Sequence, residues 1–424
     1  MGRHGAGALL LAAALTTTGT TRAGNFENEC NLAGFAASLR QTVIVLDEHH
    51  VAGESGNTVS AANAPWRRLI GNLLFADDSV LEHNFAPRER VTIILTRKDG
   101  AGTRMVFTGC VPFFSASEKA QIARDSGINQ AVSAFFGGGA VASAKKDLTL
   151  FHSRLGDSVR EAVQAAMLSS DDLELHGGDL AQSGLATSLR QGALVNLAYG
   201  IPRVILYSDL SRFLRNAPAQ REQARQAGFA LAHLINIDFK GAEIYVVGMS
   251  GNFVSRDALD ALFLASHGEL ISTGAASAVP QFLAAPIRVM RYQGVIEYPE
   301  NRYPIRIRLA TDRDGAVVDS WVSVQTGWEQ FSPFHGAISA DSSGSWRFTG
   351  DGVFAQVWNP GRANDGKPLF DVSLPFAGAR ILSLQMQQGG REIRGSISDT
   401  QIHFKGVSNY QLNFSAAPNG TGQF

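Results

Sequence analysis

The sequence lacks an excess of charge of either sign. Lysine and arginine total 37 and aspartate and glutamate total 38 among 424 residues. Without a basic stripe, nucleic acid and anionic membrane surfaces are not expected as partners. Beyond its first residues the sequence also lacks an apolar run of the ~20 residues that a membrane-spanning helix needs. We therefore expect no transmembrane span after removal of the export signal described next.

The apolar stretch at the N-terminus is itself short. Arg3 and His4 give a basic start, residues 6–15 form an apolar core, and Thr21-Arg22-Ala23 has the small-residue character of a cleavage site. This order is typical of a secretory signal peptide. We predict a signal peptide over residues 1–23 and an exported protein, periplasmic or secreted. A membrane anchor is the alternative, and it requires a longer run.

Cysteine is scarce, because the chain has only Cys30 and Cys110. An even pair in an exported chain favours a disulfide, and two buried thiols are the alternative. The bond would close a long loop, for which the chain-entropy model gives about 4 kcal/mol of stabilisation before any strain. We predict a disulfide between these two residues.

What the sequence does have is a series of buried-strand patterns. Residues 42–50 read TVIVLDEHH, in which five apolar or β-branched residues precede Asp47. Similar runs occur in residues 202–210 (PRVILYSDL), which include Asp209, and in residues 243–248 (EIYVVG). Runs without polar alternation are typical of parallel strands covered on both faces. Ligands bind beyond the carboxyl ends of such strands, so Asp47 and Asp209 are expected at a ligand-binding rim.

Helical patterns and one hairpin separate these strands. The hairpin joins strands at residues 91–96 and 104–108, and residues 269–272 form an edge strand. Helices are expected at residues 65–75, from 115, and at 147–167, 184–198, 218–234 and 257–266. This alternation indicates a doubly wound, mainly parallel sheet, which we predict as an α/β domain over residues 24–274. The antiparallel hairpin strand should bring Cys110 to the end of the sheet away from Asp47, with Cys30, which suits a disulfide.

The last third of the chain has a different pattern. A chain of this length exceeds what one hydrophobic core usually covers, so a second domain is expected. After a linker at residues 275–286, strand patterns follow one another without helices, and apolar and polar residues alternate. This pattern is typical of half-buried antiparallel strands. We predict an antiparallel β-sandwich or small β-barrel over residues 287–424, with Arg306 and Arg308 facing solvent.

The order of elements around Asp47 resembles a von Willebrand factor A-type domain, over about residues 25–273. The resemblance rests on a central strand ending in Asp47, a helix, a hairpin, helices, and then PRVILYSDL and EIYVVG. Many members of that family bind Mg²⁺ at the carboxyl edge of the sheet. They use an Asp-x-Ser-x-Ser turn, a hydroxyl from a second loop and a later aspartate. The resemblance implies that Asp47 and Asp209 match the two acids and that Ser183 or Thr187 supplies the hydroxyl.

His49 and Val51 stand where that pattern has its two serines. Because Mg²⁺ prefers oxygen ligands in octahedral geometry, this departure indicates a degenerate site. We therefore expect either no cofactor or Mg²⁺ at Asp47, Ser183 and Asp209. A zinc site begun by Asp47, His49 and His50 is a further alternative, although the sequence supplies no spaced partner set.

Two more alternatives concern other residues. Ser250 follows a strand as in a nucleophile elbow and with His267 would suggest a serine hydrolase, but Asn252 stands where that motif needs glycine. In the second domain, the aromatic residues are interpreted as core, and a sugar-binding face is the alternative. They include Trp321, Trp328, Trp346 and Trp358.

The function predicted from the sequence is non-catalytic protein binding within an envelope or secretion-associated assembly. The predicted binding residues are Asp47, His49, Ser183, Thr187 and Asp209. The alternatives are a metal-dependent hydrolase that uses Asp47, His49 and Asp209, and a carbohydrate- or lipid-binding β domain. No catalytic residue is assigned.

Overall fold

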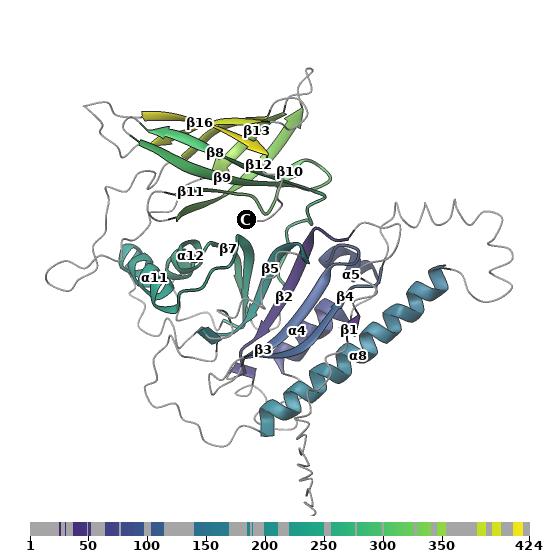
Figure 1. The fold of residues 1–424 in the computed structure, drawn as a ribbon. Helices are drawn as coiled ribbons and strands as arrows, with labels where there is room; N and C mark the ends of the chain where they lie inside the picture. The colour runs from purple at the N-terminus through teal and green to yellow at the C-terminus, as the bar shows by residue number, and fades with distance from the viewer. Residues whose placement is uncertain are drawn as a thin grey trace, which may run out of the picture.

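The computed structural model contains two sheets, one flanked by helices and one made of strands alone (Figure 1). We call the part through Gly274 the α/β domain and the part from Arg288 the β domain. The structure describes residues 25–26, 30, 37–48, 50–51, 64–75, 78–96, 103–113, 140–168, 185–186, 189, 199–210, 220–249, 256–275, 278–298, 301–325, 329–340, 346–352, 380–386, 392–399 and 410–418. The helices predicted from residue 115 and at 184–198 therefore lie wholly or mostly outside the described residues.

The sheet of the α/β domain has seven strands in the order β1-β4-β3-β2-β5-β6-β7. β2 lies at its centre, and β3, β5, β6 and β7 all run in the same direction as β2. β4 returns antiparallel to β3, which confirms the predicted hairpin. β1 adds a short edge that the sequence did not predict. The bounds are β1 Asn25–Phe26, β2 Arg40–Leu46, β3 Arg90–Thr96, β4 Thr103–Cys110, β5 Ile201–Tyr207, β6 Ala242–Val247 and β7 Gly268–Gly274.

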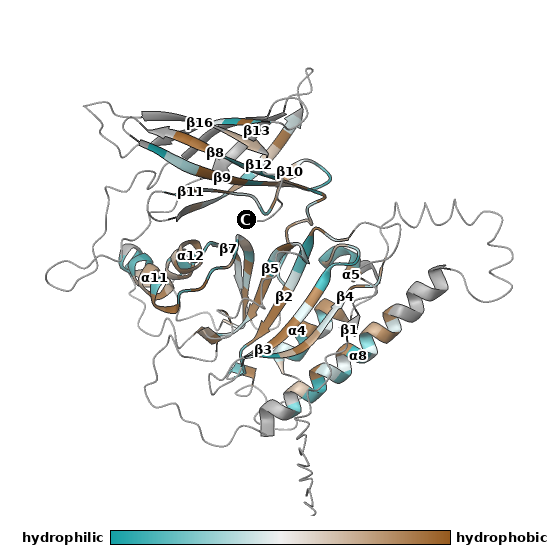
Figure 2. Cartoon of the chain, in the orientation of Figure 1, coloured by the Kyte–Doolittle hydropathy of each residue, from teal (hydrophilic) through white to brown (hydrophobic). Residues whose placement is uncertain are grey.

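Helices cover both faces of this sheet (Figure 1). Ile44 packs with α4, α5 and α8 on one face, whereas Val45 packs with α11 and α12 on the other. Every residue of β2, β3, β5 and β6 is buried, which explains why these strands show no polar alternation; Figure 2 shows them mainly in hydrophobic colours. The helices are α4 Pro65–Leu74, α5 Asp78–Asn84, α8 Ala140–Leu168, α11 Arg221–Ile235 and α12 Arg256–Ala265.

α8 is longer than the sequence predicted, because it begins at Ala140 rather than at residue 147. Its buried stripe includes Phe151, Leu155 and Val159, and Phe151 meets Phe107 of β4 edge-to-face with ring centroids 5.4 Å apart. This packing holds α8 against the sheet. Within the described part of the chain, neither α8 nor any other helix is long and apolar enough to cross a membrane.

The β domain is a nine-stranded antiparallel sheet that closes on itself. Its order is β10-β12-β11-β9-β8-β16-β15-β14-β13, and β13 also pairs with β12, which completes the ring. Of the two predicted alternatives, this closure matches the small barrel. The strands are β8 Arg288–Tyr298, β9 Asn301–Thr311, β10 Ala316–Val317, β11 Trp321–Gln325, β12 Glu329–Ala340, β13 Trp346–Gly352, β14 Arg380–Met386, β15 Ile393–Asp399 and β16 Tyr410–Pro418.

Residues 278–286 of the predicted linker are bound to the α/β domain. Phe282 meets Tyr245 of β6 with ring centroids 5.0 Å apart. The backbone N–H of Leu283 donates to the Tyr245 hydroxyl at 3.1 Å, and Arg40 donates to the Leu283 carbonyl at 2.9 Å. Because Gly274 pairs with the carboxyl end of β6 and Arg40 begins β2, this segment leads back to the end where the parallel strands start. We call that end the amino edge.

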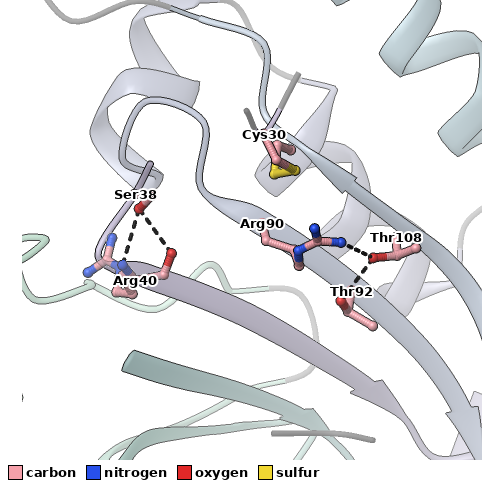
Figure 3. The surroundings of a disulfide bond; sticks show 7 residues. Cys30, Ser38, Arg40, Arg90, Thr92 and Thr108 are labelled. Atoms are coloured by element: carbon pink, nitrogen blue, oxygen red, sulfur yellow. Dashed lines mark hydrogen bonds between the residues drawn. A yellow bond between two sulfur atoms is a disulfide. The ribbon is translucent and has the colours of Figure 1, made fainter. Parts of the chain in front are cut away.

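The predicted disulfide between Cys30 and Cys110 is present, with the two Cα atoms 5.2 Å apart. Cys110 pairs with Arg90 at the start of β3, so the bond lies at the amino edge, away from Asp47. Figure 3 shows it near Arg90 and at the same end of the sheet as Arg40. The disulfide therefore joins the end of β4 to Cys30 near the N-terminus, at the end of the sheet that the strand order predicted.

Candidate functional site

Asp47 and Asp209 follow two neighbouring strands, β2 and β5. These strands run parallel, with Leu46 opposite Tyr207, so the residues that come next emerge side by side. The backbone N–H of Asp47 donates to the carbonyl of Tyr207 at 3.0 Å, which extends the pairing by one step. The two predicted acids therefore lie at the same edge of the sheet, opposite the amino edge.

Ser208 connects the two loops. Its hydroxyl donates to Oδ2 of Asp47 at 2.7 Å and accepts from the backbone N–H of Leu210 at 3.1 Å. Ser208 is buried, whereas Asp47 is partly exposed. This hydroxyl therefore holds the Asp47 carboxylate in one orientation. Ser208 was not among the site residues predicted from the sequence, although it stands directly before Asp209.

His50 lies against the second acid. Its Nδ1 is 3.9 Å from Oδ2 of Asp209, and its ring lies 5.1 Å from that of Tyr207, centroid to centroid. Gly248, after β6, has φ +110°, and a Cβ added there would lie 2.9 Å from Nε2 of His50. Glycine at this position therefore leaves room for the imidazole. We call Asp47, His50, Ser208, Asp209 and Gly248 the carboxyl rim.

The remaining predicted site residues cannot be placed at this rim. His49, Ser183 and Thr187 all lie outside the described residues. Val51 occupies one of the two serine positions of the metal-site pattern and is buried in the core, where it offers no ligand atom.

The described rim also fails to provide a set of metal ligands. It offers two carboxylates and the Ser208 hydroxyl, and that hydroxyl already donates to Asp47. No group of three histidine, cysteine, aspartate or glutamate side chains in the described residues could hold a metal ion. The described residues alone thus do not match the oxygen-rich octahedron that Mg²⁺ requires.

The serine hydrolase alternative names Ser250 and His267, and Ser250 lies outside the described residues. His267 precedes β7 at the amino edge, where its Nδ1 lies 3.3 Å from the carboxylate of Asp238. Gly248 and Met249, which lead to Ser250, follow β6 at the carboxyl end. Met249, the last described residue before Ser250, and His267 thus lie at opposite ends of the sheet.

The amino edge holds a second cluster of functional groups, centred on Glu89. Its carboxylate accepts from Arg40 at 3.2 Å, from Arg203 at 3.1 Å, from the Thr42 hydroxyl at 2.5 Å and from the backbone N–H of Ala86 at 2.7 Å. Burial alone would raise the pKa of Glu89, but the two guanidinium groups outweigh it and hold the pKa below its usual value. Burial, followed by the nearby charge of Arg40, lowers the pKa of Arg203 to about 10.

The β domain covers this amino edge. Arg308 of β9 donates to the carbonyl of Gly241 at 2.5 Å, to that of Lys240 at 3.3 Å and to that of Asp319 at 2.7 Å. Only 3% of Arg308 is exposed, so the prediction that it faces solvent is wrong. Strand alternation places it on the outer face of the β domain, and the α/β domain packs on that face.

Aromatic and charged residues complete this contact. Trp321 is buried beneath Arg308, and Phe331 of β12 faces His267 with ring centroids 5.8 Å apart. His335 of β12 pairs with Glu269 of β7, and the hydrogen bond that the His335 imidazole donates to this carboxylate raises the pKa of His335. Trp321 therefore packs between the domains rather than inside the ring of strands, where the sequence analysis had placed the aromatic residues.

No protein-family model matches this chain, and a search of curated proteins finds no match either. The two edges of the sheet must therefore be interpreted from their own geometry. The amino edge is buried beneath the β domain. The carboxyl rim combines Asp47, which the Ser208 hydroxyl contacts, with Asp209, whose side chain is 36% exposed.

Proposed function

We propose that this is an exported, non-catalytic binding protein whose carboxyl rim contacts a protein partner. The observation that carries the proposal is that, among the described residues, the β domain packs on one edge of the sheet, the amino edge, and not on the carboxyl rim. The amino edge is used internally, because Arg308 and Trp321 of the β domain pack on Gly241 there. The carboxyl rim lies at the other end, where ligands bind in open α/β sheets.

The described rim favours a basic group on the partner. Asp47 and Asp209 present two carboxylates, and Ser208 fixes the first of them before any partner arrives. A preorganised carboxylate loses little conformational freedom on binding. Arginine can bind a carboxylate through two parallel hydrogen bonds, which makes an arginine-bearing loop or peptide a suitable partner for this rim.

The von Willebrand A-type relationship is part of this proposal. The order of elements in the structure supports it, because a central strand, a helix, a hairpin and two further parallel strands occur in that sequence. The disulfide supports the exported location, since such bonds persist in oxidising compartments. An envelope or secretion-associated assembly is the proposed setting.

The other proposed functions receive less support from the described contacts. A metal-dependent hydrolase at the rim needs a set of metal ligands, and the described residues contain no group of three histidine, cysteine, aspartate or glutamate side chains that could hold a metal ion. A sugar-binding face on the β domain needs exposed aromatic rings, and Trp321 is buried against the α/β domain.

Replacing Asp209 with asparagine is expected to weaken capture of the partner at least about tenfold, because a desolvated carboxylate–cation pair is worth roughly 2 kcal/mol or more. The measurement is quantitative mass spectrometry of proteins that the immobilised chain retains from native envelope extract. Asp157→Asn on α8 is the matched control, since Asp157 is exposed and pairs with Arg160 three residues later in the same helix. Equal capture by the wild type and the Asp209 variant would contradict the proposal.

A further inference from the structure

Two acidic side chains, Glu243 and Asp319, meet inside the interface between the domains. Glu243 belongs to β6 of the α/β domain, and Asp319 precedes β11 of the β domain. Their exposed fractions are 0% and 2%. Burial raises the pKa of each carboxyl group, and the charge of Asp319 raises that of Glu243 further, whereas a hydrogen bond with Glu243 opposes the rise at Asp319.

The hydrogen bonds of this pair are incomplete when both groups are ionised. Oε2 of Glu243 accepts from the Tyr245 hydroxyl at 3.1 Å. With both groups ionised, Oε1 of Glu243 and both carboxylate oxygens of Asp319 are buried and receive no hydrogen bond from the described residues. The hydrogen bond between the two groups forms only when one of them carries a proton. Unsatisfied buried acceptors are costly. A proton on one carboxyl group turns an acceptor into a donor and satisfies an oxygen of the other group.

In the described contacts, the surrounding arginines donate their hydrogen bonds to other groups and not to Glu243 or Asp319. Arg40 and Arg203 donate to Glu89, and Arg308 donates to backbone carbonyls. These guanidinium groups still act on the pair through their charges, and Glu269 opposes them. A metal ion is a poor occupant, since cationic groups surround the pair and the described residues supply no third ligand of the kind that zinc or magnesium uses.

We propose that Glu243 and Asp319 share one proton across the interface, so that the β domain docks on the α/β domain with uptake of a proton. The proton lies between one carboxyl group and one carboxylate, as in other pairs of closely placed acids. This shared proton does not depend on what the carboxyl rim binds. It makes the docked state responsive to the pH of the compartment.

The direction of the pH dependence follows from the raised pKa values. In the separated state both groups titrate near the usual carboxyl range, about pH 4. Docking is therefore strongest below that pH and weakens as pH rises through the raised values. Glu89 has a lowered pKa, so its contribution to the pH dependence of stability is confined to more acidic conditions. His335 also has a raised pKa, so its contribution to stability is likewise lost as pH rises. The experiment must therefore remove His335 to isolate the contribution of Glu243 and Asp319.

The test is urea-induced unfolding of the full chain between pH 5 and pH 8. In the His335→Gln background, uptake of one proton on docking predicts that the unfolding equilibrium constant rises about tenfold per pH unit within this range. Adding Glu243→Gln should remove most of this slope and make the protein more stable than its parent at pH 8. Asp319→Asn is the second variant, because asparagine tolerates the left-handed conformation at this position, where φ is +50°.

Two results would overturn the proposal. One is an unchanged pH slope in both variants. The other is destabilisation by Glu243→Gln at every pH, which would mean that Glu243 is ionised and held by a neighbouring cation. Arg203 is the cation to consider in that case, because its Nη1 is buried without an acceptor among the described residues and Arg203 pairs with Glu243 in the sheet.

Discussion

Replacing Gly241 with alanine is expected to separate the β domain from the amino edge and to lower the free energy of unfolding by about 2 to 4 kcal/mol. Gly241 has φ +76°, a conformation that residues with a Cβ adopt at a cost. A Cβ here would lie 2.3 Å from Nε1 of Trp321 and 3.1 Å from Nη2 of Arg308. The added methyl group therefore displaces the two side chains that hold the β domain. Urea unfolding and Trp fluorescence would measure the effect.

The matched control for this prediction is Gly71→Ala. Gly71 lies within α4, and a Cβ added there would meet no atom within 4 Å. Alanine favours a helix over glycine by up to about 1 kcal/mol, so this variant should be neutral or slightly stabilised. If both variants unfold like the wild type, the contact between Gly241 and Trp321 does not hold the domains together.

Replacing Glu89 with glutamine is expected to cost about 3 to 5 kcal/mol, the usual loss when one partner of a buried ion pair is removed. Arg40 and Arg203 would then lie within the protein without the carboxylate that both contact. Arg40 begins β2 and Arg203 is the third residue of β5, both at the sheet centre, so we expect cooperative loss of the α/β fold rather than local fraying. Thermal unfolding followed by circular dichroism would measure the change.

The pH dependence of the Glu89 effect has the opposite sign to that of Glu243. Because the pKa of Glu89 is lowered, its stabilisation is present above the usual carboxyl pKa and is lost as pH falls through the lowered value. The difference between wild type and Glu89→Gln should therefore shrink in acid. Asp257→Asn is the control, since its ion pair with the largely exposed Arg221 should contribute less than about 1 kcal/mol. A loss of similar size in both variants would show that the buried ion pairs of Glu89 stabilise the protein no more than a surface ion pair does.

The α/β sheet could be predicted from the sequence because its strands are buried on both faces. Five apolar or β-branched residues before Asp47, and similar runs later in the chain, identify β2, β5 and β6 without any knowledge of their neighbours. The position of the disulfide followed from the direction of the hairpin. α5 was missed because it is short, at seven residues, and carries little apolar periodicity.

The environment of Arg308 could not be predicted in the same way. Alternation with Ile307 and Leu309 correctly places it on the opposite face from the core of the β domain. A strand pattern does not reveal whether water or another domain covers that face. The partnership of Glu243 with Asp319 was invisible for the same reason, because the two residues come from different sheets.

At the carboxyl rim, the sequence placed Asp47 and Asp209 together but missed the roles of Ser208 and His50. Their contacts depend on the exact register of β2 and β5, in which Leu46 lies opposite Tyr207. Once this register is known, Ser208 must emerge next to Asp47. A search for a hydroxyl beside each predicted acid would have identified it.

The most direct test of the central claim, that the carboxyl rim is the binding face, is site-specific photo-crosslinking in native envelope extract. A photoreactive residue is placed at Met249, directly after Gly248 of the rim, or at Val295 on β8, which is 42% exposed in the β domain. We expect a partner to be crosslinked at Met249 and not at Val295, and Asp209→Asn to reduce the yield of this product at least about tenfold. A partner that is crosslinked at Val295, with no product at Met249, would contradict this claim.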